Sequence, residues 1–126
     1  MQTLEEEAKE YMKRKSNSFT FDDYQAKAKE TAIYPQNVKL LYPALGLTGE
    51  AGEVANKVKK VVRDGVNNMP SDWREQIAAE LGDVLWYVAS VATDLNLSLG
   101  QIAEENNTKL NSRKERGTIG GFGDTR

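Results

Sequence analysis

The sequence predicts an all-α fold, a bundle of four to five helices, and three observations support this prediction. Apolar residues recur at intervals of three and four along most of the chain, which is the period of an amphipathic helix. No stretch alternates apolar and polar residues as a half-buried strand does. The segment 84–92 is apolar on nearly every side, which is typical of a helix buried on several faces. Such a helix is either the central helix of a bundle or one that also packs against another subunit, and we expect oligomerisation to complete the bundle.

The expected helices have recognisable beginnings and ends. Pro35, Gly65 and Asn96 are suitable residues to stop the second, third and fourth helices. Residues that favour a helix N-terminus begin the five segments, namely Thr3, Thr20, Pro43, Ser71 and Ser98. The helices are expected at residues 3–15, 20–33, 43–64, 71–95 and 98–114. The chain then divides into a short helix with a linker (1–18, the linker at 16–18), a helical domain (19–116) and a glycine-rich tail (117–126).

The composition limits the chemistry that this chain can perform. With 126 residues, a net charge of −2 and no apolar run of about 20 residues, we expect one domain that binds neither nucleic acid nor membrane. The acidic N-terminus has no apolar signal core, so we expect a cytoplasmic protein. The chain contains no cysteine and no histidine. Any catalysis must therefore use carboxylates, Lys, Tyr, Ser or Thr, or a hard metal ion held by oxygen atoms.

Two pairs of acids flank the apolar stripes of consecutive helices. Glu50 and Glu53 lie three residues apart on the third helix, and Glu80 and Asp83 have the same spacing on the fourth. If these helices pack against each other, the four carboxylates converge. Such a group needs cations, because like charges disfavour ionisation. Oxygen ligands without His or Cys select Mg²⁺, or Mn²⁺ as a substitute, with Ca²⁺ as a further alternative.

Glycines and a tyrosine accompany these acids. Gly46, Gly49 and Gly52 each cost about 1 kcal/mol relative to Ala in a helix interior, so we expect backbone or ligand to approach closely there. Tyr87 lies on the stripe of Glu80 and Asp83.

Each of these features also has a simpler interpretation. Acids three apart are common on solvated helix surfaces, and Tyr87 is also typical of a tyrosine at the edge of a core. The tail is either disordered or a lid. Several basic residues are candidate phosphate ligands or solvated helix residues, namely Lys57, Lys60, Lys109 and Arg113.

The chain resembles the MazG-like nucleoside triphosphate pyrophosphohydrolases of the all-α NTP-pyrophosphatase superfamily. The resemblance covers about residues 19–126. It is carried by GLTGEAGEV at 46–54, ELGDVLWY at 80–87, NTKLNSR at 107–113 and, more weakly, Tyr24-Gln25. One departure is Gly49, where many members have a second acid, and this could alter the number of metal ions or the rate.

The resemblance implies hydrolysis of (deoxy)nucleoside triphosphates to the monophosphate and pyrophosphate, with a possible role in cleaning the nucleotide pool. It implies Mg²⁺ on the four acids, with Glu50 or Glu53 as the base that activates water, and a homodimer or homotetramer. It implies that Asn107, Lys109 and Arg113 bind phosphates and that Tyr24, Gln25 and Tyr87 lie near the sugar or base. Lys57 is a further candidate substrate-binding residue, which the resemblance does not supply. Two alternatives remain: a pyrophosphatase that prefers dUTP or dCTP, and a non-catalytic helical oligomerisation or nucleotide-sensing module.

Overall fold

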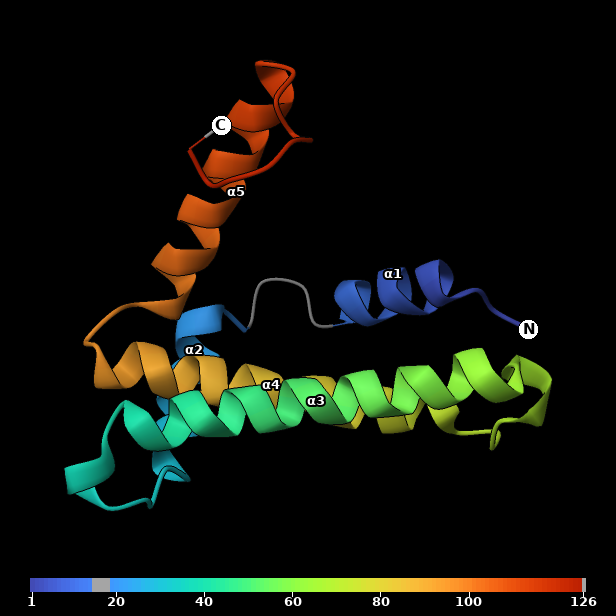
Figure 1. The fold of residues 1–126 in the computed structure, drawn as a ribbon, viewed down its shortest axis with the longest axis horizontal. Coiled ribbons are helices and arrows are strands. Elements are labelled where there is room, and N and C mark those ends of the chain that lie inside the picture. The colour runs from blue at the N-terminus through green and yellow to red at the C-terminus, as the bar shows by residue number, and fades with distance from the viewer. Residues whose placement is uncertain (15–18, 126) are drawn as a thin grey trace.

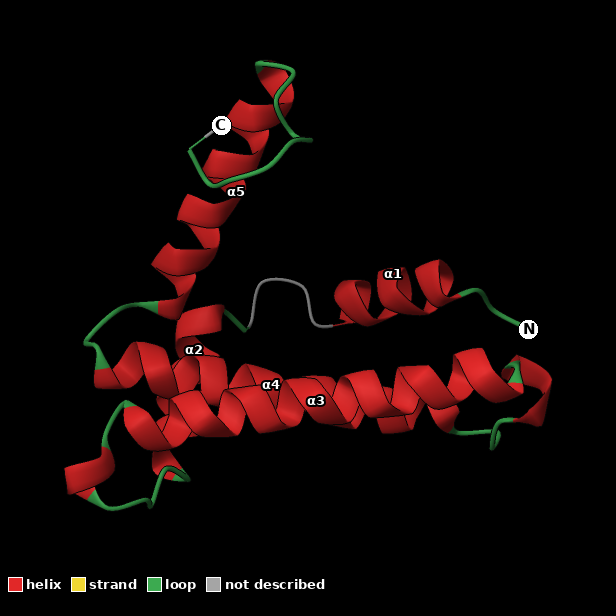
Figure 2. Ribbon diagram, in the orientation of Figure 1, coloured by secondary structure: helices red, strands yellow, loops and turns green. Residues whose placement is uncertain are grey.

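The computed structural model describes residues 1–14 and 19–125, and this part of the chain folds into helices and loops without a strand (Figure 2). The all-α prediction is therefore confirmed. The linker expected at 16–18 lies outside the described residues. The α-helices are α1 (Leu4–Arg14), α2 (Phe21–Glu30), α3 (Leu41–Asp64), α4 (Trp73–Asp94) and α5 (Leu99–Glu115). Short 3₁₀ turns at Gln36–Val38 and Val66–Asn68 precede α3 and α4.

The long helices α3 and α4 form an antiparallel pair that is the body of the molecule (Figure 1). The helix α2 packs mainly on α4, near the end of the pair where α3 begins and α4 ends. The helix α5 contacts α2 at its own beginning and then extends away from the pair. The helix α1 lies beside the other end, where Glu7 forms an ion pair with Arg74 of α4 at 3.7 Å.

Local hydrogen bonds explain most helix boundaries. Thr20 and Asp23 form a capping box, because each side chain accepts the other residue's backbone N–H, at 3.0 and 2.9 Å. Gly65 ends α3 with φ of +83°, and Asn96 follows α4 with φ of +56°. Both φ values are positive, a conformation that Gly and Asn adopt more readily than other residues.

The start of α3 depends on a contact from a distant part of the chain. Leu40 has φ of 64° and ψ of −52°, and the Leu41 N–H donates to the Lys39 carbonyl at 2.7 Å, which is a strained γ-turn. The Asp94 carboxylate accepts the Leu40 N–H at 2.8 Å and so stabilises this turn. As a result α3 begins at Leu41, before the expected Pro43, which is buried in its first turn.

The core of the single chain is small. Among the residues that the structure describes, the buried hydrophobic side chains are small or medium, namely Ala28, Ala89, Ala92 and Leu99, beside the buried Pro43. The chain of 14.0 kDa exposes 9740 Å², whereas a compact monomer of this mass exposes about 6700 Å². Among the described residues, no helix combines the length and apolarity that a membrane span requires.

Candidate active site

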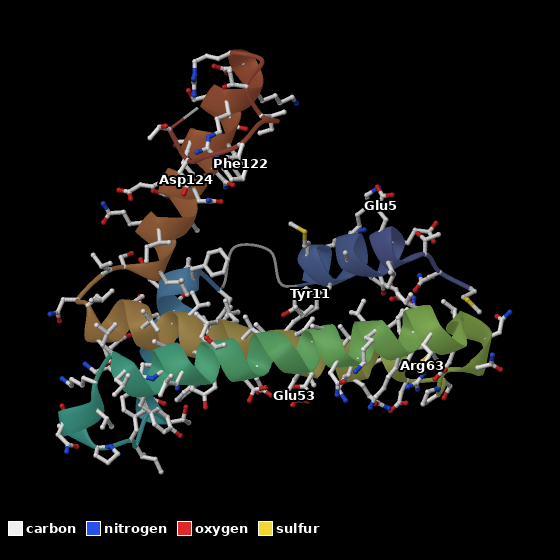
Figure 3. All side chains as sticks on the ribbon, viewed as in Figure 1. Glu5, Tyr11, Glu53, Arg63, Phe122 and Asp124 are labelled. Carbon is white, nitrogen blue, oxygen red and sulfur yellow. The ribbon has the colours of Figure 1, made fainter. Side chains whose placement is uncertain are left out.

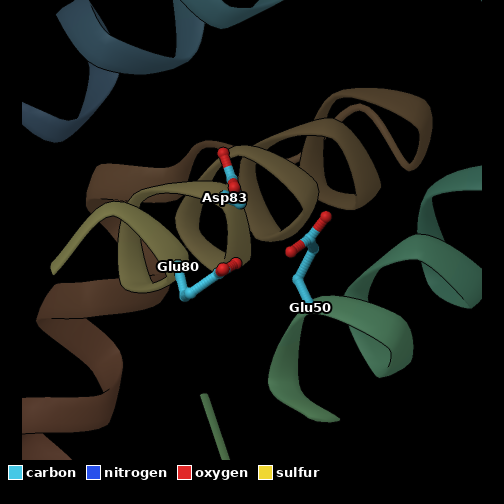
Figure 4. A group of neighbouring side chains, drawn as sticks. All are labelled: Glu50, Glu80 and Asp83. Atoms are coloured by element: carbon cyan, nitrogen blue, oxygen red, sulfur yellow. The ribbon is translucent and has the colours of Figure 1, made fainter. Parts of the chain in front are cut away.

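The antiparallel pairing of α3 and α4 brings together three of the four predicted acids. One carboxylate oxygen from each of Glu50, Glu80 and Asp83 lies within 4.8 Å of the other two. Figure 4 shows Glu50 extending from α3 toward Glu80 and Asp83 on α4. Glu50 and Glu80 are half-buried and Asp83 is exposed. We call these three residues the acid cluster.

The electrostatics of the acid cluster are unfavourable without a cation. Burial raises the pKa of Glu50 above its ordinary value, and the charges of Asp83, Glu80 and Glu53 raise it further. A group of converging carboxylates with a penalised charge is a suitable donor set for a hard divalent ion. Since the chain has neither His nor Cys, this donor set consists of oxygen only.

Glu53 does not join the acid cluster. Its side chain is exposed, although its charge is close enough to raise the pKa of Glu50. Figure 3 shows its place on α3. Glu80 and Asp83 have the same spacing and both join, so the packing of α3 on α4, and not the spacing, leaves Glu53 outside. The structure thus brings together three carboxylates and leaves the fourth beside them.

Lys57 contacts the acid cluster directly. Its ammonium nitrogen lies 3.7 Å from Oε1 of Glu80, and the pair crosses from α3 to α4. The side chains of Lys57 and Glu80 are 31% and 19% exposed, so the pair is half-buried. Lys57 is thus a basic residue predicted from the sequence that forms an ion pair with the acid cluster itself.

A row of tyrosines adjoins the acid cluster. Burial, the neighbouring Tyr42 and the charges of Glu50 and Asp83 raise the pKa of Tyr87. The rings of Tyr42 and Tyr87 lie 6.4 Å apart, and Tyr42 stacks on Tyr34 at 4.8 Å. Tyr42 was not among the site residues predicted from the sequence. Its spacing of eight residues before Glu50 would have indicated the same face, but only if α3 had been expected to begin at Leu41.

The glycines of α3 have different surroundings. A Cβ atom added to Gly46 would overlap the ring of Tyr87, so this glycine permits the close approach of an aromatic side chain. Gly49 and Gly52 have nothing within 4 Å of such an atom. At Gly46 the close neighbour is therefore a side chain, and the expectation that a ligand approaches Gly49 and Gly52 stays a prediction.

Tyr24 and Gln25 differ in their relation to the acid cluster. Burial and the charge of Asp83 raise the pKa of Tyr24, which places its hydroxyl within electrostatic reach of the cluster. The Gln25 amide instead joins α2 to the turn between α4 and α5. It donates to Thr93 Oγ1 at 3.1 Å and to the Leu97 carbonyl at 2.8 Å, and it accepts the Leu99 N–H at 2.9 Å.

The three remaining candidates lie on α5, which extends away from the acid cluster of the same chain (Figure 1). Asn107 and Lys109 are exposed, and Arg113 is only 4% exposed. The Arg113 guanidinium donates to the Asp124 carbonyl at 2.6 Å, so the tail folds back along α5 (Figure 3). These residues do not meet the acid cluster within one chain.

Comparisons with known proteins place the chain in a family. The model of the MazG nucleotide pyrophosphohydrolase domain matches residues 39–118, which include α3, α4, the acid cluster and α5. The chain belongs to this family of nucleotide pyrophosphohydrolase domains. It is also similar to the Gene 37 protein of Mycobacterium phage L5, with 48% identity over 111 residues that cover 83% of this chain and 97% of that protein. No solved structure gives a significant match.

Proposed function

We propose that this protein is a Mg²⁺-dependent enzyme that hydrolyses (deoxy)nucleoside triphosphates to the nucleoside monophosphate and pyrophosphate. The observation that carries the proposal is the convergence of Glu50, Glu80 and Asp83 within 4.8 Å in a chain of the MazG family. Mn²⁺ is expected to substitute, because the same oxygen ligands accept it.

The acids have separate roles in the proposed reaction. Glu50, Glu80 and Asp83 would hold the divalent ion, which when bound neutralises phosphate charge and polarises the phosphorus–oxygen bonds. Glu53 is the carboxylate left outside the acid cluster, and we assign it the role of general base. The oxygen of a water molecule attacks phosphorus, the bond between the α- and β-phosphates breaks, pyrophosphate leaves and Glu53 takes the proton of the water.

The tyrosines near the acid cluster supply the proposed nucleoside contacts. Tyr87 and Tyr24 lie within electrostatic reach of Asp83, and Tyr42 extends the aromatic surface from Tyr87. We assign to these rings the sugar and the base, which aromatic faces and hydroxyl groups bind well.

The test is pyrophosphate release from each of the eight common (d)NTPs, with Mg²⁺ and with Mn²⁺. We expect turnover with at least one nucleotide. Glu80→Ala or Asp83→Ala should lower the activity by more than about 100-fold. This exceeds the loss that follows when a residue that only hydrogen-bonds to a metal ligand is replaced. Glu75→Ala removes an exposed acid of α4 outside the acid cluster and is the matched control. Nucleotide or metal binding without pyrophosphate release would refute the enzymatic proposal in favour of a sensing module.

We further propose that the protein works as a homo-oligomer in which α5 of one copy completes the site of another. Two observations support this. The single chain exposes about 3000 Å² more than a compact monomer of its mass. Its candidate phosphate ligands Asn107 and Lys109 lie on a helix that extends away from its own acid cluster.

Mixing two inactive variants tests this arrangement. Asp83→Ala lacks a metal ligand and Lys109→Ala lacks the proposed phosphate ligand, so each homo-oligomer should be inactive. A mixed oligomer contains one site with an intact acid cluster and an intact Lys109 from the other chain, and it should regain activity. A mass of 14.0 kDa by light scattering, or no regain after verified subunit exchange, would refute it.

A further inference from the structure

Lys57 lies between the acid cluster and a neighbouring cavity. Its ammonium lies 3.7 Å from Glu80, inside the electrostatic field of the acid cluster. The same side chain lines a cavity of about 310 Å³ between the second half of α3 and the beginning of α4. Lys57 is thus the residue that the acid cluster and this cavity share.

The charges around Lys57 favour two alternative positions for its ammonium. Without a divalent ion, the three carboxylates of the acid cluster attract it, because it offsets part of their mutual repulsion. A divalent ion on the same carboxylates would repel it and would take Glu80 as a ligand. The four-carbon stem of lysine is flexible enough to move the ammonium away from Glu80.

The lining of this cavity contains a second ammonium group besides that of Lys57. Lys60, one turn further along α3, also lines it, together with Trp73 and Gln76 of α4. The carboxylate in its lining, Asp64, accepts two hydrogen bonds of 2.7 Å from Arg63, and the charges of Arg63 and, more weakly, Lys60 also lower its pKa, so its charge is compensated mainly by Arg63. Two ammonium groups beside a compensated carboxylate make this a place for an oxyanion.

We propose that Lys57 is an internal counter-cation that competes with the divalent ion for Glu80 and, once displaced, binds an oxyanion in the cavity together with Lys60. This inference rests on the proposed function, in which the oxyanion is a phosphate of the substrate. Divalent-ion binding and oxyanion binding are then coupled through one side chain. By linkage, each of them tightens the other by the same factor.

The first test measures Mn²⁺ affinity by calorimetry without nucleotide. Lys57→Met keeps most of the apolar stem and removes the competing charge, so it should bind Mn²⁺ about two- to fivefold more tightly than the wild type, the range of a partly exposed ion pair. Lys60→Met removes an equal charge from the same cavity without touching Glu80 and should match the wild type. Unchanged or weaker Mn²⁺ binding by Lys57→Met would overturn the competition. Lys57→Gln gives the same readout if Lys57→Met does not fold.

The second test adds sulfate as the oxyanion, with chloride at equal ionic strength as the reference. Sulfate should tighten Mn²⁺ binding by the wild type and should have no such effect on Lys57→Met. No effect on the wild type, or an equal effect on both proteins, would overturn the coupling. Neither test involves turnover, so a failure of the proposed hydrolysis leaves both results interpretable.

Discussion

The ring of Tyr87 on α4 lies against the backbone of Gly46 on α3, in space that a Cβ atom would occupy. Gly46→Ala should therefore destabilise the protein by about 1–3 kcal/mol through overpacking, although alanine is the better helix former. Gly49→Ala and Gly52→Ala enter open space and should stabilise it by up to about 1 kcal/mol. Urea unfolding of the three variants measures the difference. Equal effects at Gly46 and Gly49 would show that the Tyr87 contact does not constrain α3.

The repulsion within the acid cluster gives a second prediction, on the metal-free protein. Glu50→Gln removes the charge whose ionisation burial and neighbouring carboxylates oppose, so the variant should melt at a higher temperature than the wild type in EDTA at neutral pH. Added Mg²⁺ should raise the melting temperature of the wild type more than that of the variant. Glu75→Gln serves as the control for an exposed acid on α4. A variant that melts lower in EDTA would indicate that Glu50 stabilises the fold rather than a bound ion.

The helices were predictable because their signals are local. The apolar period, the Thr20 cap and the Gly65 stop place all five helices within about three residues of their observed bounds. The start of α3 was missed because it depends on Asp94, which accepts the Leu40 N–H from 54 residues further along the chain. No short-range pattern reports such a contact.

Two acidic stripes on consecutive helices predicted that carboxylates of α3 and α4 meet. They did not predict which of the four carboxylates do so. Glu50 and Glu53 have the same spacing from the apolar face within the precision of a sequence pattern, and only the packing of α3 on α4 separates them. The direction of α5 depends on its contact with α2, and the sequence of α5 carries no signal for it.

Gln25 provides a third prediction, which separates a structural role from substrate binding. Gln25→Ala removes three hydrogen bonds and leaves the Leu99 N–H without its partner, so it should cost about 1–3 kcal/mol of stability. If the role is structural, kcat and KM at a temperature well below the melting transition should change little. A loss of kcat/KM beyond about tenfold in the folded variant would assign Gln25 to the substrate instead. Gln101→Ala, which removes an exposed amide bonded to Glu105, is the control.

The contact between Tyr34 and Asp94 gives the fourth prediction, on alkaline stability. The Tyr34 hydroxyl donates to Asp94 at 2.7 Å, and burial together with this carboxylate raises the pKa of Tyr34 to about 12. An unfolded tyrosine has a pKa of about 10. Between these values the folded chain keeps a proton that the unfolded chain has lost, so the free energy of unfolding falls as the pH rises from about 10 to about 12.

Tyr34→Phe keeps the ring that stacks on Tyr42 and removes this titration. Its free energy of unfolding should be lower than that of the wild type at pH 8, because Asp94 loses a hydrogen-bond donor, and should fall less steeply above pH of about 10. Chemical denaturation at intervals between these pH values measures both slopes, with Tyr11→Phe as the control for an exposed hydroxyl on α1. Parallel curves for the wild type and Tyr34→Phe would show that the Tyr34 proton is not retained on folding. Asp94 would then stabilise the Leu40 turn, and with it the first turn of α3, without the help of this tyrosine.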